Sequence, residues 1–246
     1  MRSIDDILLF RGDISPFLVH LTKGKESATA AQVLKQIILE RKVKPGATLV
    51  SDVRYGGFTN GMNEDDQRDF FGATCFTETP LDEVHCLLEV QYRNINLEPY
   101  GLVFLKENLS KKWVSPVFYL NNEAGDKDSV AQDLFRLIET SERTAERLLP
   151  LFAVFGQKIK HPGAHEEPVG RVDFRWEREW RQPYYKGGVE FTENDVFVGL
   201  CPDEEIAAFE QLFAGIPFVD PRRPMKWYAT KLIRSRQRLD IKVSVV

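Results

Sequence analysis

Apolar and polar positions alternate along the chain in short blocks that predict strands. Such blocks are short, rich in β-branched and aromatic side chains, and bounded by charged or glycine-containing segments. They cover Phe17–Thr22, Ala47–Val53, Ala73–Glu78, Tyr100–Lys106 and Ser115–Leu120.

Helical spacing predicts the elements between these strands. Ser27 is a suitable N-cap for a helix over Ala28–Arg41, and Thr79 with Pro80 for another after the third strand. A long amphipathic stretch covers Ser129–Lys158, with an interruption near Pro150. Because strands and helices follow each other without a regular βαβ rhythm, we expect an α+β fold. Its core would be a mixed, mostly antiparallel sheet with inserted helices.

Composition does not divide the chain, so we expect a single domain over residues 1–246. The net charge of −4 is uneven, because the basic C-terminal segment 220–246 carries eight Lys or Arg against two Asp. This segment is either a phosphate-binding surface, with nucleic acid as the partner, or a solvated helix and strand docked on an acidic body.

Several absences limit the class of protein. The chain contains no apolar run long enough to span a membrane, and its beginning lacks the apolar core of a secretion signal. Three cysteines without a C-x-x-C motif favour a reducing, cytoplasmic location without disulfides or zinc. His161 and His165 are separated by Pro162 and Gly163, which disfavours a helical metal pair, so we expect no metal site.

The stretch V-D-F-R-W-E-R-E-W-R, residues 172–181, is the strongest candidate for chemistry. Alternation of large aromatic and charged residues favours an extended strand. Glu177 and Glu179 would then share one face, with their carboxylates about 6.5–7 Å apart. Either Arg175 and Arg181 complete a solvent-facing ladder of salt bridges, or the two acids face a cation or a reacting sugar.

Three other features favour a site over a ladder. His20 and Thr22 share one face of the first strand, and Cys75–Glu78 forms a polar strand end. A long loop rich in glycine, asparagine and acidic residues carries Tyr55. Together these are the parts that a cleft for cleaving NAD requires.

The blocks F-L-V-H-L-T, C-F-T-E-T-P-L, Y-G-L-V-F-L-K, P-V-F-Y and E-R-E-W-R carry a resemblance to a known family. Their order over the first 180 residues or so resembles the abortive phage infection family AbiGi, which is labelled the antitoxin component of a phage-defence pair. The layout is more distantly similar to ADP-ribosyltransferases, including the DarT type that modifies DNA.

The second resemblance implies roles for residues of this chain. Glu179 would be the catalytic carboxylate, Glu177 the base toward the acceptor, and His20 the polar residue of the early strand. The remaining implied residues bind NAD: Thr22 on the ribose or diphosphate side, Arg11 or Arg54 on phosphate, and Tyr55, Phe76 or Tyr119 against nicotinamide.

Two hypotheses from different classes follow. The first is an antiviral, NAD-consuming mono-ADP-ribosyltransferase of abortive infection. The second is a non-catalytic antitoxin or binding module that pairs with a cognate toxin or antitoxin protein. It is favoured because the chain lacks the S-T-S strand that the resemblance to ADP-ribosyltransferases would imply. A magnesium-dependent nuclease is a third reading, but the acids lack the usual spacing.

Overall fold

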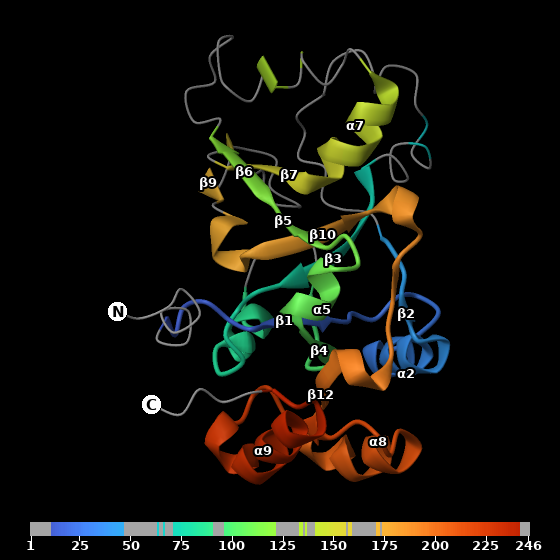
Figure 1. Ribbon diagram of the computed structural model, residues 1–246, viewed down its shortest axis with the longest axis vertical. Coiled ribbons are helices and arrows are strands. Elements are labelled where there is room, and N and C mark those ends of the chain that lie inside the picture. Colours follow the sequence, from blue (N-terminus) through green and yellow to red (C-terminus); the bar gives the residue numbers. More distant parts are fainter. Residues whose placement is uncertain are drawn as a thin grey trace. The chain divides into compact units, whose positions relative to one another are not determined.

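The computed structural model describes residues 11–46, 63, 66, 71–90, 96–121, 133–134, 136, 141–155, 157–158, 171–172 and 174–241 (Figure 1). Contacts divide the chain into two compact units. The first unit contains Met1–Lys42, Phe76–Lys112 and Glu190–Val246, and the second contains Val43–Cys75 and Trp113–Val189. Both units are discontinuous in sequence, and the single domain expected from composition stays a prediction.

The first unit contains a mixed sheet. Strands β1 (Phe17–Leu21) and β4 (Gly101–Leu105) are antiparallel, with Val19 opposite Val103. Strand β12 (Val196–Leu200) is antiparallel to β4 and parallel to β13 (Phe218–Val219). On the other side of β1, Val19 is antiparallel to Thr77 at the end of β3 (Ala73–Thr77). The expected α+β fold with a mixed, mostly antiparallel sheet is confirmed.

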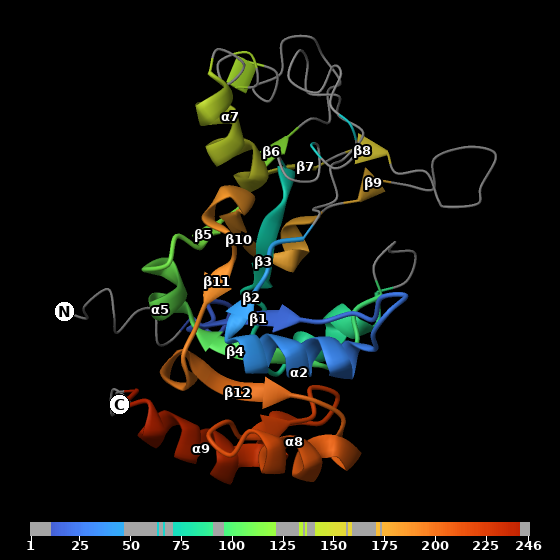
Figure 2. The same cartoon turned by 90° about the vertical axis from the view of Figure 1, so that its right-hand side faces the viewer.

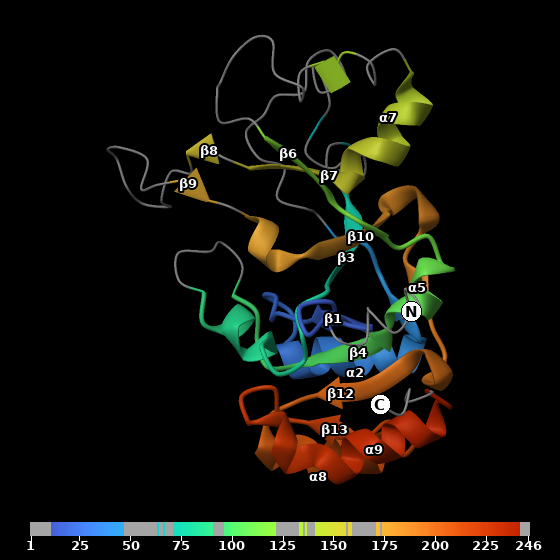
Figure 3. The ribbon, with the colours of Figure 1, turned by 60° about the vertical axis from the view of Figure 1, so that its left-hand side comes forward.

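Helices of the first unit pack beside this sheet. They are α2 (Ala30–Glu40), α5 (Lys106–Ser110), α8 (Ile206–Leu212) and α9 (Ala229–Arg238). Figure 2 shows α2 alongside β1 and β4, and Figure 3 shows α8 and α9 along β13 and β12. Short 3-10 helices connect these elements: η1 (Val84–Leu88), η5 (Glu193–Asp195), η6 (Asp203–Glu205) and η7 (Met225–Tyr228).

The first helix begins two residues later than its sequence predicts. Thr29, not Ser27, is the N-cap, because its side chain accepts a hydrogen bond from the Gln32 amide and the Gln32 side chain accepts one from the Thr29 amide. This reciprocal capping box satisfies two helix-end donors, and Ser27 has no glutamate or glutamine three residues later. The buried stripe of Ala30, Leu34, Ile37 and Ile38 is as expected.

The helix predicted after Thr79 is only the 3-10 turn η1. The Thr79 amide donates to the Thr77 hydroxyl at 3.1 Å, and the two hydroxyls lie 2.7 Å apart. Thr79 therefore extends the polar end of β3 instead of capping a helix.

Aromatic rings fill the core of the first unit. Phe104 is fully buried and meets Phe76 and Phe191 edge-on, at centroid distances of 5.8 and 5.2 Å. Phe17 stacks on Phe197 at 4.2 Å. These rings lock β1, β4 and β12 together, since close aromatic pairs add specific geometry to the burial of apolar surface.

Among its described residues, the second unit contains short strand pairs and the helix α7 (Glu142–Leu148). Strand β10 (Glu179–Pro183) is antiparallel to β5 (Ser115–Pro116) and neighbours β3 in the sheet order. Strands β6 (Phe118–Asn121) and β7 (Phe152–Phe155) are parallel. The other elements are η2 (Leu149–Leu151), β8 (Gln157–Lys158), β9 (Arg171–Val172), η3 (Phe174–Glu177) and η4 (Tyr184–Lys186).

Two sequence predictions change in this unit. The strand expected over Ser115–Leu120 is split into β5 and β6, which have different partners. The helix expected to reach Lys158 ends before Pro150, and Phe152–Phe155 is a strand because it pairs with β6. The strand expected over Ala47–Val53 lies outside the described residues. Strands β2 (Lys42–Val43) and β11 (Val189–Glu190) lie where the chain passes from one unit to the other.

Gly199 offers a sharp test of the packing between β12 and β13. A Cβ at this position would lie 2.1 Å from the Phe218 ring, which is fully buried. We expect Gly199→Ala to lower the free energy of unfolding by about 1–3 kcal/mol through overpacking. Gly12→Ala is the matched control, because no atom lies within 4 Å of its added Cβ. Equal urea midpoints for the two variants would contradict this packing.

Candidate functional site

The stretch predicted as one strand is broken by a turn. After β9, the chain forms η3, and Arg178 adopts a left-handed backbone with φ of 44° before β10 begins at Glu179. The Arg178 amide donates to the Arg175 carbonyl at 3.1 Å, which closes the turn. The prediction of a continuous extended strand over residues 172–181 is therefore wrong.

The turn reverses the faces expected from alternation. Glu177 and Arg181 are buried, at 9% and 8% exposure, whereas Trp176 is 41% exposed. In a continuous strand, the tryptophans would lie on one face and the two glutamates on the other. Glu177, Glu179 and Arg181 instead lie inside the second unit, whereas Arg175 is exposed. A solvent-facing ladder that includes both glutamates is therefore ruled out.

Arg181 fixes the position of Glu179. Its Nη2 donates to Glu179 Oε2 at 2.6 Å, and the two side chains are only 9% and 13% exposed. Its Nη1 donates to the carbonyls of Pro150 and Phe152, at 3.0 and 3.1 Å. Burial alone would lower the pKa of Arg181, but the negative charge of Glu179 raises it, so the guanidinium stays charged.

Cys75 and Tyr119 share the environment of the two glutamates. Burial, followed by the charge of Glu179, raises the pKa of the Cys75 thiol well above its ordinary value, and Glu177 adds to the effect. Burial also raises the pKa of Tyr119 to about 12, again with contributions from both glutamates. The Tyr119 hydroxyl accepts a hydrogen bond from the Glu179 amide at 2.8 Å. The positive charge of Arg181 opposes the rise in the pKa of both groups, so Cys75, Tyr119, Arg181 and the two glutamates form one electrostatic cluster in the second unit.

His20, Thr22 and Phe76 lie in the first unit. His20 is half-buried in β1, and its ring centroid is 5.7 Å from that of Phe76. Thr22 is buried, and its hydroxyl bonds the carbonyls of Ala30 and Tyr100 at 3.1 and 3.2 Å. The structure therefore brings His20 and Phe76 together, whereas the Thr22 hydroxyl is engaged in hydrogen bonds to main-chain carbonyls.

The remaining predicted residues are Arg11, Arg54 and Tyr55. Arg11 is exposed and pairs with Asp13, with 2.6 Å between Nε and Oδ1. Arg54 and Tyr55 lie outside the described residues. The roles assigned to all nine candidate residues, Tyr119 included, stay predictions.

Sequence reasoning missed most of the surroundings of Glu179. The spacing of Glu179 and Arg181, two residues apart, places them on one face of a strand, and this signal can be read from the sequence. Nothing local to Cys75 signals its proximity to the glutamates, because that depends on the pairing of distant strands. The carbonyls of Pro150 and Phe152 become Arg181 acceptors only after the chain breaks at Pro150.

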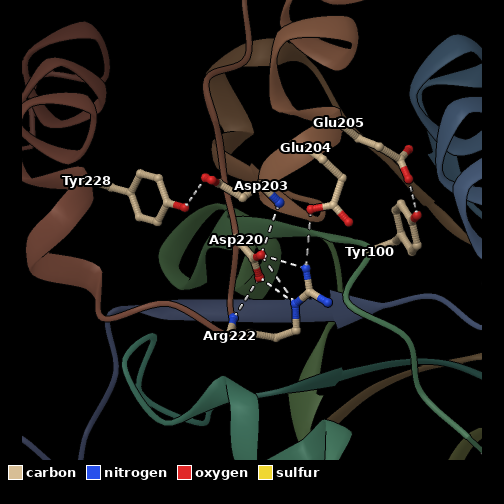
Figure 4. A network of polar contacts seen from close by, with 7 residues as sticks. All are labelled: Tyr100, Asp203, Glu204, Glu205, Asp220, Arg222 and Tyr228. Atoms are coloured by element: carbon tan, nitrogen blue, oxygen red, sulfur yellow. Dashed lines mark hydrogen bonds and ion pairs between the residues drawn. The ribbon is translucent and has the colours of Figure 1, made fainter.

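A second polar network occupies the first unit, where β12 and β13 end (Figure 4). Arg222 binds Asp220 through two nitrogens, at 2.9 and 2.7 Å, and the Asp203 amide donates to the same carboxylate at 3.0 Å. Burial alone would raise the pKa of Asp220, but hydrogen bonds from Arg222 and Asp203 hold it below its usual value. A hollow of about 390 Å³ is lined by Glu204, Asp220, Arg222 and Arg223.

Three cations of the basic segment form contacts within the first unit. Arg222 pairs with Asp220, and Lys231 pairs with Glu210 at 2.7 Å. Arg238 donates to the carbonyls of Glu193 and Val196, at 2.8 and 2.6 Å. The contacts of these three cations support the reading in which segment 220–246 is docked on an acidic body, rather than the reading in which it is a phosphate-binding surface.

Comparisons with known proteins identify no relative. No family model, curated protein or solved structure matches the chain.

Among the described residues, no helix is long and apolar enough to cross a membrane. Within the same residues, no group of three or more His, Cys, Asp or Glu side chains could hold a metal ion.

Removal of Arg181 should destabilise the second unit. We expect Arg181→Met to cost about 3–5 kcal/mol in the free energy of unfolding, because the Glu179 carboxylate is left buried without its partner. Arg143→Met, an exposed position on α7, should change this value by less than about 0.5 kcal/mol. Urea unfolding followed by circular dichroism measures both, and a similar small change in both variants would refute the buried pair.

Thiol reactivity tests the electrostatics around Cys75. Cys86 is exposed, whereas Cys201 is buried, which raises the pKa of its thiol to about 12. At pH 8 we expect one rapid equivalent with a disulfide reagent, from Cys86, and reaction of Cys75 at least about 10-fold slower because its thiolate is disfavoured. Cys86→Ser should remove the rapid phase. A rapid phase that survives in this variant would mean that Cys75 lies outside the negative field.

Proposed function

We propose that the chain is a cytoplasmic phage-defence protein whose second unit carries an NAD-dependent, ADP-ribosyltransferase-like site. The carrying observation is that the Glu179 carboxylate is nearly buried in the second unit, 2.6 Å from Arg181 Nη2, and that Glu177 is buried in the same unit. Carboxylates held at fixed positions favour a positive charge that develops beside them. The phage-defence setting rests on the resemblance of the sequence motifs.

The proposed chemistry begins with cleavage of NAD as a substrate. The bond between ribose C1′ and nicotinamide breaks, nicotinamide leaves with the bonding electrons, and an oxocarbenium-like charge develops on the ribose. Glu179 stabilises this charge and holds the ribose 2′-hydroxyl. Arg181 orients Glu179 through the 2.6 Å hydrogen bond. An acceptor nucleophile then bonds to C1′, and Glu177 takes its proton.

The second candidate is a non-catalytic module that binds a cognate toxin or antitoxin protein. One observation favours it: the charge of Glu179 is already compensated by Arg181, and both side chains are nearly buried. A carboxylate paired in this way stabilises an additional cation less strongly than an unpaired one would. In this case the pair serves only the fold of the second unit.

Transfer of label from NAD separates the two candidates. The purified chain would be incubated with NAD labelled in the adenylate half and with cell extract, and nicotinamide release would be followed in parallel. The transferase predicts a labelled macromolecule, with a loss of about 10²–10³-fold in Glu179→Asp, which keeps the charge but withdraws the carboxylate. Glu190→Gln is the control, because this side chain is exposed in the first unit.

Stability must be measured on the same samples. Glu179→Gln alone would be ambiguous, since it also leaves Arg181 buried without an anion. A folded Glu179→Asp protein with full turnover would remove Glu179 from catalysis. A wild-type chain that is folded, releases no nicotinamide and gains no thermal stability from NAD would favour the binding module.

A further inference from the structure

Cations and aromatic rings alternate on one surface of the second unit. The Arg147 guanidinium lies 5.5 Å from the centroid of the Tyr185 ring, and its Nε contacts the Tyr185 hydroxyl at 3.4 Å. Lys186 Nζ lies 5.1 Å from the same centroid and 3.9 Å from that of Trp113. We name these four residues the cation–aromatic ladder: Arg147, Tyr185, Lys186 and Trp113.

Trp113 is held in an unusual position. Its side chain is 63% exposed, and its backbone is left-handed, with φ of 67°. This backbone conformation is unfavourable for a bulky L-residue, and here it does not serve to bury the indole. Outliers of this kind cluster at ligand-binding surfaces, where the strain is retained for function.

The two cations of the ladder keep their charge available. Within the part of the chain that the structure describes, neither Arg147 nor Lys186 forms an ion pair with a carboxylate. Arg147 is also exposed. The basic segment differs, because Arg222 and Lys231 there are each neutralised by an acid. The ladder is therefore better suited to an anionic partner than this part of the tail.

We propose that the cation–aromatic ladder binds single-stranded nucleic acid. A base would stack on the Trp113 indole, and neighbouring phosphates would lie against Arg147 and Lys186. Proteins that bind single strands combine aromatic platforms with positive charge in this way. An acidic peptide would use the two cations but would leave the exposed indole without a planar partner. This inference is independent of the proposed transferase, because it concerns equilibrium binding through other residues.

Fluorescence anisotropy with a labelled 20-nucleotide probe tests this inference. The probes are oligo-dT, oligo-U and a duplex of the same length, at 50 and 200 mM salt, with a poly-glutamate peptide as competitor. We expect a single strand to bind more tightly than the duplex, and Trp113→Ala to weaken binding about 10-fold. Lys186→Glu should weaken binding and lower the salt dependence by about one counterion.

Trp227 provides a matched control. It is also 63% exposed, and Arg223 lies 5.4 Å from its ring, but it belongs to the basic segment of the first unit. Trp227→Ala should bind as the wild type does, as should Glu179→Asp.

Three results would overturn the proposal. The first is the absence of binding to either single strand at 50 mM salt, and the second is loss of binding in Trp227→Ala but not in Trp113→Ala. The third is displacement of the probe by the acidic peptide with unchanged affinity in Trp113→Ala, which would identify the ladder as a protein-binding surface. Thermal unfolding of each variant confirms that it is folded.

Discussion

The arrangement of the second unit depends on the ion pair between Arg181 and Glu179. Both side chains are nearly buried, so the cost of removing two charges from water must be met by their mutual attraction and by further hydrogen bonds. Arg181 obtains these bonds from the carbonyls of Pro150 and Phe152. One guanidinium thereby joins β10 to η2 and to the start of β7, and it fixes the direction of the candidate catalytic carboxylate.

The burial of this ion pair is consistent with the turn that interrupts the charged stretch over residues 172–181. A regular strand from Val172 would keep Glu177 and Glu179 on one face, two residues apart. The left-handed Arg178 breaks the strand, and both carboxylates nevertheless act on Cys75 and Tyr119. A turn, not alternation along one strand, thus sets the positions of the two acids. Their burial in one unit supports the transferase proposal, whereas the compensation of Glu179 by Arg181 supports the binding module.

Local patterns predicted the first unit better than the second. The strand at Phe17 and the helix from Ala30 follow period-two and period-3.6 patterns, because each buries one face against the same large core. In the second unit, short strands pair with distant segments, so the pairing of β6 with β7 decides that Phe152–Phe155 is extended. For the candidate site, the sequence singled out Glu177 and Glu179, whose roles stay predictions, and the spacing of Glu179 and Arg181. Tyr119 and the carbonyls of Pro150 and Phe152 come from segments far from them in the chain.

A double-mutant cycle between Glu179→Gln and Arg181→Met measures the central interaction directly. The free energies of unfolding of the wild type, both single variants and the double variant would be obtained under identical conditions. If the two side chains form a buried pair, the double variant should be more stable than the sum of the single effects predicts, by about 2 kcal/mol or more. Additivity within about 0.5 kcal/mol would show that the pair does not exist in solution.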